Sequence, residues 1–364
     1  DWLMRACIFL VISCPCALVI SVPLGFFGGI GASSKIGVLV KGSNYLEACG
    51  DLNTFVFDKT GTLTKGEFRV NKVRPFDGIS EDEVLEAASE VEKYSTHPIA
   101  VSIKEAYEKL GKNKALKEYD IKEIPGHGIE GVSGDVSVLC GNDKLLKSHD
   151  ISYEPNNDIG TIIYVARKDE KNDEGYEFLG SITISDGIKD GVENALKSLK
   201  DIGIKKTVML TGDRKNISEA VAKQIGIDEV RSELLPGDKV ASIEEFLGEG
   251  KTAFVGDGIN DAPVLMRADV GFAMGSLGSD AAIEAADIVI MDDDMGKLAK
   301  VIKIAAKTVR IVRENIVFAL AVKFAVLLLG ALGIANMWAA VFSDVGVAVL
   351  AILNSMRTLR VDFS

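Results

Sequence analysis

Three long apolar runs limit what this chain of 364 residues can fold into. They cover residues 6–30, 316–334 and 337–353. A helix needs about 20 apolar residues to cross a bilayer, so each run predicts a transmembrane helix. Only Ala335 and Asn336 separate the second run from the third, which predicts a tight membrane hairpin. Buried core helices of a soluble protein are the alternative, and three runs of this length make it the weaker interpretation.

The charges around these runs predict an orientation. Basic residues flank the hairpin and follow the first run: Arg310, Arg313, Arg357, Arg360, Lys35 and Lys41. Because positive residues stay on the cytosolic side, the polar middle of the chain, about residues 35–310, is expected in the cytosol. We therefore expect an integral membrane protein, in the plasma membrane, that contacts lipid. The net charge of −12 argues against nucleic acid as a partner, because nucleic acid selects basic surfaces.

The polar middle alternates short apolar runs with helical patterns. The runs that predict strands are NTFVFDKTGT, TVMLTGD (207–213), TAFVGDGIND (252–261), VGFAM (270–274) and IVIMDDD (288–294). Helical patterns such as GVENALKSLKDIG and NISEAVAKQIG lie between them. This alternation predicts an α/β fold whose parallel sheet is covered on both faces. Functional residues are then expected at the carboxyl ends of the strands.

The pattern changes between about residues 67 and 176. Helical patterns cover residues 81–94 and 98–111, and strand-like pieces such as GIEGVSGDVSVLCG and GTIIYVARKDE follow. This stretch predicts a separate α+β domain, inserted between the first strand of the sheet and the rest.

Carboxylates follow two of the predicted strands. Asp58 ends the first strand, and Asp257 and Asp261 follow another in GDGIND. Carboxylates from neighbouring strand ends can hold one Mg²⁺, and one left free to attack is a nucleophile for a phosphoryl group. Phosphoryl transfer also needs donors and positive charge, which Thr211 and Lys239 are placed to supply. Taken singly, each of these residues is more often a helix cap or a solvated surface residue.

The motifs DKTGTLT, TGD and GDGINDAP together resemble the signature set of the P-type ATPases. The resemblance implies a haloacid-dehalogenase-like Rossmannoid phosphorylation domain, in two parts at 35–66 and 177–310. It also implies ATP and Mg²⁺ as cofactors, with Asp58 as the residue that ATP phosphorylates. The catalytic residues that it implies are Asp58, Thr211, Asp213, Lys239, Asn260 and Asp261. The Mg²⁺ ligands that it implies are Asp58, Asp257 and the backbone carbonyl of Thr60.

The inserted domain carries a second set of motifs. EKYSTHPIA and PGHGIEG look like the nucleotide-binding signature of the heavy-metal, or type IB, branch of that family. By this resemblance Glu92, His97, Gly126 and Gly128 bind the nucleotide, and residues 67–176 form the nucleotide-binding domain. A histidine can stack on a purine, and glycines let the backbone approach a ligand closely. A helix-start histidine and an ordinary glycine turn are the alternative.

The first apolar run, in a predicted membrane domain at 1–34, contains Cys14-Pro15-Cys16. Residues two apart on a regular helix point in roughly opposite directions. A proline removes one helical hydrogen bond, and local unwinding lets both thiols face one site. Thiolates select soft or borderline metals such as Zn²⁺, Cd²⁺ and Cu⁺. The stretch resembles the Cys-Pro-Cys helix of the heavy-metal pumps, which implies that both cysteines bind the transported metal.

Two ionisable residues lie inside the predicted hairpin at 311–364, namely Lys323 and Asp344. Such residues are functional candidates by default. With Asp344 as a third metal ligand and Lys323 as counter-ion, a divalent cation balances the charge of the two thiolates. The lysine and the Asp-x-Gly pattern resemble the zinc, cadmium and lead subgroup. The Tyr-Asn and Met-Ser motifs of copper pumps do not occur in these runs.

The sequence as a whole is identified as the C-terminal portion of a Zn²⁺-, Cd²⁺- or Pb²⁺-exporting P-type ATPase. The Thr-Gly-Glu loop with which the family hydrolyses its aspartyl phosphate does not occur in it. The actuator domain and the earlier transmembrane helices are accordingly expected outside this chain. Two alternatives stay open: a phosphatase of the same fold with a membrane anchor, and a non-catalytic metal-binding membrane subunit. Metal-stimulated ATP turnover would discriminate between them.

Overall fold

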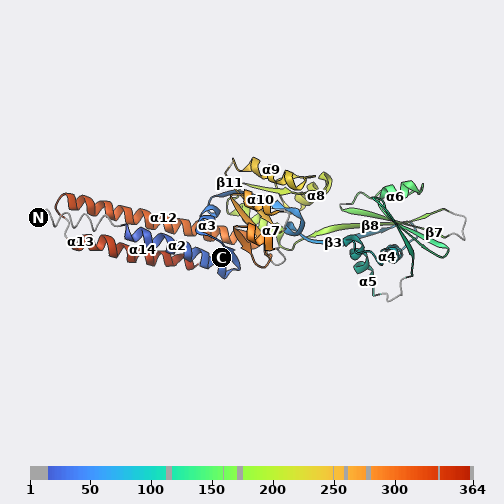
Figure 1. Cartoon of the computed structure of the whole chain (residues 1–364), viewed down its shortest axis with the longest axis horizontal. Coiled ribbons are helices and arrows are strands. Elements are labelled where there is room, and N and C mark those ends of the chain that lie inside the picture. The colour runs from blue at the N-terminus through green and yellow to red at the C-terminus, as the bar shows by residue number, and fades with distance from the viewer. Residues whose placement is uncertain are drawn as a thin grey trace. The chain divides into compact units, whose positions relative to one another are not determined.

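The computed structural model describes residues 15–111, 117–158, 160–169, 175–248, 250–257, 261–275, 280–334 and 337–360. The chain divides into two compact units (Figure 1). One unit is Leu63–Lys189, and the other combines Asp1–Thr62 with Asp190–Ser364. The predicted inserted domain, residues 67–176, falls inside the first of these. This unit is longer because β3 (Thr64–Pro75) begins before residue 67 and β8 (Glu177–Ile188) lies after residue 176.

The larger unit is built on a seven-stranded sheet in the part of the chain that is described. Its strands, in spatial order, are β1 (Val38–Val40), β13 (Ile288–Ile290), β12 (Val270–Met274), β11 (Lys251–Gly256), β2 (Leu52–Asp58), β9 (Lys206–Leu210) and β10 (Glu229–Arg231). All neighbours are parallel except β1 and β13. The predicted α/β fold with a parallel sheet is confirmed. Sequence patterns missed the two short edge strands β1 and β10.

Helices cover both faces of this sheet. Those of the α/β part are α3 (Ser43–Cys49), α7 (Val192–Asp201), α8 (Lys215–Ile225), α9 (Pro236–Phe246), α10 (Ala262–Arg267) and α11 (Asp280–Ala285). Val56 and Phe254 share one buried cluster with Ile243 of α9 and Leu265 of α10. Alternate residues of β2 point the other way, where the ring of Phe55 lies 5.8 Å from that of Phe272. Both faces are therefore apolar, as a doubly covered parallel sheet requires.

The same unit carries helices with the length and apolarity to cross a membrane. Three candidate spans occur among the described residues: Cys16–Lys35, Gly296–Ala331 and Met337–Leu359. The first two are single helices, α2 (Cys16–Lys35) and α12 (Gly296–Ala331). The third consists of four consecutive helical segments: α13 (Met337–Val341), η3 (Phe342–Gly346), α14 (Val347–Ser355) and η4 (Met356–Leu359). The helix α12 starts well before the predicted run, because its charged first half packs against α3 and α7. It therefore continues from the sheet into the bundle without a break (Figure 1).

The smaller unit is a six-stranded antiparallel sheet with helices on both faces. Its strands, in spatial order, are β3 (Thr64–Pro75), β8 (Glu177–Ile188), β7 (Thr161–Asp169), β6 (Val136–Gly141), β5 (Gly128–Ser133) and β4 (Asp120–Ile124). Its helices are α4 (Glu81–Val91), α5 (Pro98–Glu108) and α6 (Asp143–Ser148). Val138 and Cys140 share a cluster with α4 and α5, whereas Leu139 shares one with Leu145 of α6. This alternation along β6 puts α6 on the face opposite to α4 and α5.

Candidate active site and membrane ion pair

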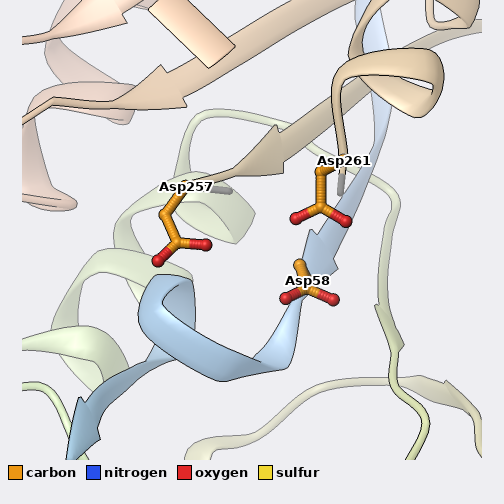
Figure 2. A group of neighbouring side chains, drawn as sticks. All are labelled: Asp58, Asp257 and Asp261. Carbon is orange, nitrogen blue, oxygen red and sulfur yellow. The ribbon is translucent and has the colours of Figure 1, made fainter. Parts of the chain in front are cut away.

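Three aspartates meet at the carboxyl edge of the parallel sheet (Figure 2). Asp58 is the last residue of β2, and Asp257 directly follows the neighbouring strand β11. Asp261 precedes the first turn of α10. One carboxylate oxygen from each lies within 4.8 Å of the others. Neighbouring parallel strands end at the same edge, which brings together residues separated by almost 200 positions in the sequence.

Lys239 of α9 inserts its ammonium group into this cluster. Its Nζ contacts Asp58 Oδ1 and lies 3.0 Å from Asp261 Oδ1. Burial lowers the pKa of Lys239, but the two aspartates raise it by more, so that its pKa lies above the ordinary value. The lysine therefore stays charged, and its ammonium group holds the carboxylates of Asp58 and Asp261 close together.

Asp58 is 6% exposed. Burial and the charge of Asp261 raise the pKa of Asp58 to about 6, although Lys239 acts in the opposite direction. Three carboxylates with one lysine leave an excess of negative charge in a region of low dielectric constant. Mg²⁺ takes oxygen ligands of this kind, so the residues present fit such an ion.

The loop after Asp58 is shaped by a close approach. Gly61 has φ +74°, and a Cβ atom there would collide with the carboxylate of Asp257. Only glycine permits both the conformation and the contact. Thr60, whose carbonyl is a predicted Mg²⁺ ligand, precedes it in extended conformation, with φ −74° and ψ 127°.

The strand end of β9 adds a second charged pair. Thr211 is 3% exposed, and its Oγ1 accepts a hydrogen bond of 3.1 Å from the backbone N–H of Asp213. The carboxylate of Asp213 lies 2.5 Å from Lys59 Nζ. Sequence reasoning missed Lys59, although its position next to Asp58 was a signal that could have found it. Predicted Asn260 lies outside the described residues.

In the smaller unit, the predicted nucleotide residues lie at the ends of elements. Glu92 ends α4, and His97 precedes α5, where its Nδ1 accepts a hydrogen bond of 3.3 Å from Ile99 N. Gly126 has φ +74°, in the turn between β4 and β5. Gly128 begins β5, and a Cβ atom there would collide with the carbonyl of Cys140.

Two side chains that no motif pointed to hold the backbone at or near these residues. Asn142 Nδ2 donates a hydrogen bond of 2.8 Å to the carbonyl of Gly126, and so holds the glycine turn. Lys104 Nζ donates to the carbonyl of Ser95 at 2.8 Å, in the loop between Glu92 and His97. Burial raises the pKa of Glu92, and Lys104 acts against that shift. Each contact joins residues of different elements or loops, so only the fold reveals them.

The membrane helices bring two predicted residues together. Lys323 of α12 is 8% exposed, and its Nζ lies 3.6 Å from Asp344 Oδ1. That oxygen is buried and accepts no hydrogen bond from the described residues. Asp344 lies in η3, a turn of π-helix between α13 and α14. Such turns interrupt α-helices frequently at functional sites.

Cys16 begins α2 at the level of this ion pair. Its neighbour Ala17 shares a buried cluster with Ala319 and Val347, which lie one turn from Lys323 and Asp344. The sulfur of Cys16 is in a disulfide, so it would need reduction before it could bind a metal. Predicted Cys14 lies outside the described residues.

Comparisons with known proteins identify the family. The model of haloacid dehalogenase-like hydrolases matches residues 52–269, so the chain belongs to the haloacid dehalogenase-like hydrolase family. It is 55% identical over 364 residues to the cadmium, zinc and cobalt-transporting ATPase of Bacillus subtilis (strain 168), which covers 99% of this chain and 51% of that protein. It is 51% identical over 363 residues to the zinc-transporting ATPase of Synechocystis sp., which covers 99% of this chain and 49% of that protein. The chain thus spans about half the length of the curated relatives it matches.

A solved structure extends the likeness to three dimensions. The chain resembles a zinc-transporting PIB-type ATPase in its E2.Pi state with a TM-score of 0.85 and 34% identity, over 98% of this chain and 58% of that one. The predicted resemblance to the heavy-metal branch of the P-type ATPases is thereby confirmed.

Proposed function

We propose that this chain forms the catalytic domains and three membrane helices of a pump that exports Zn²⁺, Cd²⁺ or Pb²⁺ with the energy of ATP hydrolysis. One observation carries the proposal: a single unit holds both the Asp58 cluster and the Lys323–Asp344 pair. The helix α12 connects the two. A phosphatase with a simple membrane anchor has no need for a buried ion pair between its spans. The orientation with both domains in the cytosol, and a plasma membrane location, belong to the same proposal.

The proposed reaction begins with the carboxylate of Asp58. With a pKa of about 6, this group is largely ionised at neutral pH and available for attack. An oxygen of Asp58 forms a bond to the terminal phosphorus of ATP, and the bond to the ADP oxygen breaks with its electron pair leaving on ADP. Lys239 offsets negative charge beside the phosphoryl group, and Thr211 offers it a hydroxyl. Asp58, Asp257 and the carbonyl of Thr60 would hold Mg²⁺, which supplies charge neutralisation when bound.

The smaller unit is proposed to bind ATP through Glu92, His97, Gly126 and Gly128. His97 is exposed at the start of α5, where its ring is free to stack on a purine. Gly126 has open space beside it, because no atom lies within 4 Å of a Cβ atom built there. Asn142 fixes the carbonyl of Gly126 and thereby the shape of the turn.

We expect His97→Ala and Gly126→Val each to weaken ATP binding by the full chain by about tenfold, which is about 1.4 kcal/mol. Removing the ring deletes a stacking surface, and valine strains a backbone with positive φ. Isothermal titration calorimetry measures the affinity. The matched control is Gly134→Val, since Gly134 also has positive φ and open space but lies in the β5–β6 turn. Equal losses in Gly126→Val and Gly134→Val would show a general effect on folding and place the nucleotide elsewhere.

The transport proposal is tested on the full-length parent protein. ATP hydrolysis should rise at least about tenfold when Zn²⁺, Cd²⁺ or Pb²⁺ is added, because thiolates and one carboxylate suit soft divalent ions. Cu⁺ should stimulate poorly, since a monovalent ion leaves the site with uncompensated charge. Turnover measured across these ions under reducing conditions gives the ranking. Metal-independent hydrolysis would favour the anchored phosphatase, and absence of hydrolysis the non-catalytic subunit.

A further inference from the structure

A buried polar cluster joins the three membrane helices at a second level, away from the Lys323–Asp344 pair. It consists of Ser21 on α2, Asn315 on α12, and Asn354 and Ser355 on α14, and is called the clamp below. Asn315 is 2% exposed and Ser355 1%. Asn315 precedes Lys323 by eight residues, so the clamp lies about 12 Å from the pair along α12, towards the sheet.

The amide of Asn315 is the centre of the clamp. Its Nδ2 donates to the carbonyl of Ala351 at 3.1 Å and to Ser355 Oγ at 2.9 Å. Its Oδ1 accepts from Asn354 Nδ2 at 2.9 Å. Ser355 Oγ in turn donates to the carbonyl of Ser21 at 3.0 Å. Both amide donors of Asn315 and its acceptor are thus in use, and sliding α12 along α14 would break the three bonds of Asn315 at once.

The contacts between the clamp and the ion pair do not fix this register. Ala17, Ala319, Val347 and Ala348 fill that interval, and all of them are small or medium-sized apolar residues. Apolar contact is non-directional, so it holds the helices together without selecting one axial position. Directional hydrogen bonds select one, because a displaced buried amide keeps its desolvation cost without its partners.

The turn that holds Asp344 needs hydrogen bonds that fix its axial position. It is a π-turn, so the regular α-helical ladder is interrupted where the carboxylate points at Lys323. From Val347 to Ser355, however, α14 is regular. A regular helix carries an axial constraint at Ser355 along its length to Gly346, the last residue of the π-turn.

We propose that Asn315 is a positioning residue for the metal site: it fixes the register of α12 against α14 and thereby holds Lys323 opposite Asp344. This role rests on the proposed function, which assigns Lys323 and Asp344 to that site. Asn315 itself does not touch the transported ion.

The experiment measures Zn²⁺ affinity by equilibrium dialysis on the reduced, detergent-solubilised full-length parent. Asn315→Leu keeps the number and branching of the side-chain heavy atoms but removes the hydrogen bonds of Asn315, and should weaken Zn²⁺ binding about tenfold while leaving the KM for ATP unchanged. Ser355→Ala removes fewer contacts and should weaken it less, which provides a milder variant if Asn315→Leu does not fold. The matched control is Thr308→Val on the same helix. Its hydroxyl is buried without a hydrogen-bond partner among the described residues, so no change in affinity is expected.

The deciding measurement combines Asn315→Leu, or Ser355→Ala in its place, with Lys323→Met. If the clamp acts by placing Lys323, its loss should cost less than about twofold further once the lysine is gone. Fully additive losses, or no loss in either clamp variant, would overturn the positioning role and leave the metal site standing. If Lys323→Met alone left Zn²⁺ affinity unchanged, the proposed metal site would be wrong, and this role with it.

Discussion

Asp58→Asn is expected to abolish phosphorylation of the chain by ATP. An amide cannot act as the attacking carboxylate, so incorporation of radiolabel from the terminal phosphate of ATP should fall to background, a loss of at least about a hundredfold. The fold should survive, because asparagine has nearly the same volume and can still accept a hydrogen bond from Lys239. Acid-stable, hydroxylamine-sensitive labelling after gel separation measures the effect.

The matched control for this prediction is Asp201→Asn. Asp201 ends α7 on the surface, outside the cluster of three aspartates. The Asp201→Asn variant should incorporate as much radiolabel from ATP as the wild type. If Asp58→Asn retained the label in full, the nucleophile would be another residue and the proposed reaction would fail at its first step.

Asp344→Asn is expected to weaken binding of Zn²⁺ by the full-length parent on the order of a hundredfold. Two thiolates, a divalent ion and Lys323 then leave one positive charge without compensation. An uncompensated charge within a membrane costs about 2.5–3.5 kcal/mol on insertion scales, and each 1.4 kcal/mol is about tenfold in affinity. Lys323 Nζ lies 3.6 Å from Asp344 Oδ1, so the substitution removes a negative charge directly beside the lysine.

The double variant tests the charge balance itself. Adding Lys323→Met to Asp344→Asn restores neutrality with a divalent ion, so the double variant should bind Zn²⁺ better than Asp344→Asn alone. The control is Lys303→Met, since Lys303 is an exposed lysine in the first half of the same helix. Losses from Asp344→Asn and Lys323→Met that simply add would contradict a shared metal site.

The α/β fold was predictable because its signals are local. Val56 and Phe254 lie in runs of apolar residues with turn signals at both ends, and such runs predict buried parallel strands whatever the rest of the chain does. From that prediction the meeting of Asp58, Asp257 and Asp261 follows, since parallel neighbours end at one edge. The short edge strands β1 and β10 were not predicted, and a run of three residues alone is weak evidence for a strand.

The boundaries of the inserted unit were also beyond local signals. A change in pattern marked residues 67–176, but β3 begins before that range and its antiparallel partner β8 lies after it. Pairing extends a strand for as long as the partner offers hydrogen bonds, and the partner of β3 lies more than 100 residues away. The roles of Glu92, His97, Cys14, Cys16 and the other site residues stay predictions that the experiments above test.

The amino-acid pattern alone predicts which segments are apolar enough to enter a membrane, which runs form the parallel sheet, and therefore where its carboxylates gather. Three contacts emerge only once the chain is folded: Lys59 with Asp213, Asn142 with the turn of Gly126, and Asn315 between α12 and α14. The two groups differ in the range of the interactions involved. Apolar periodicity acts between neighbours in sequence and can be read there, whereas a side chain that bonds to a distant element depends on how whole helices and strands come to lie against each other.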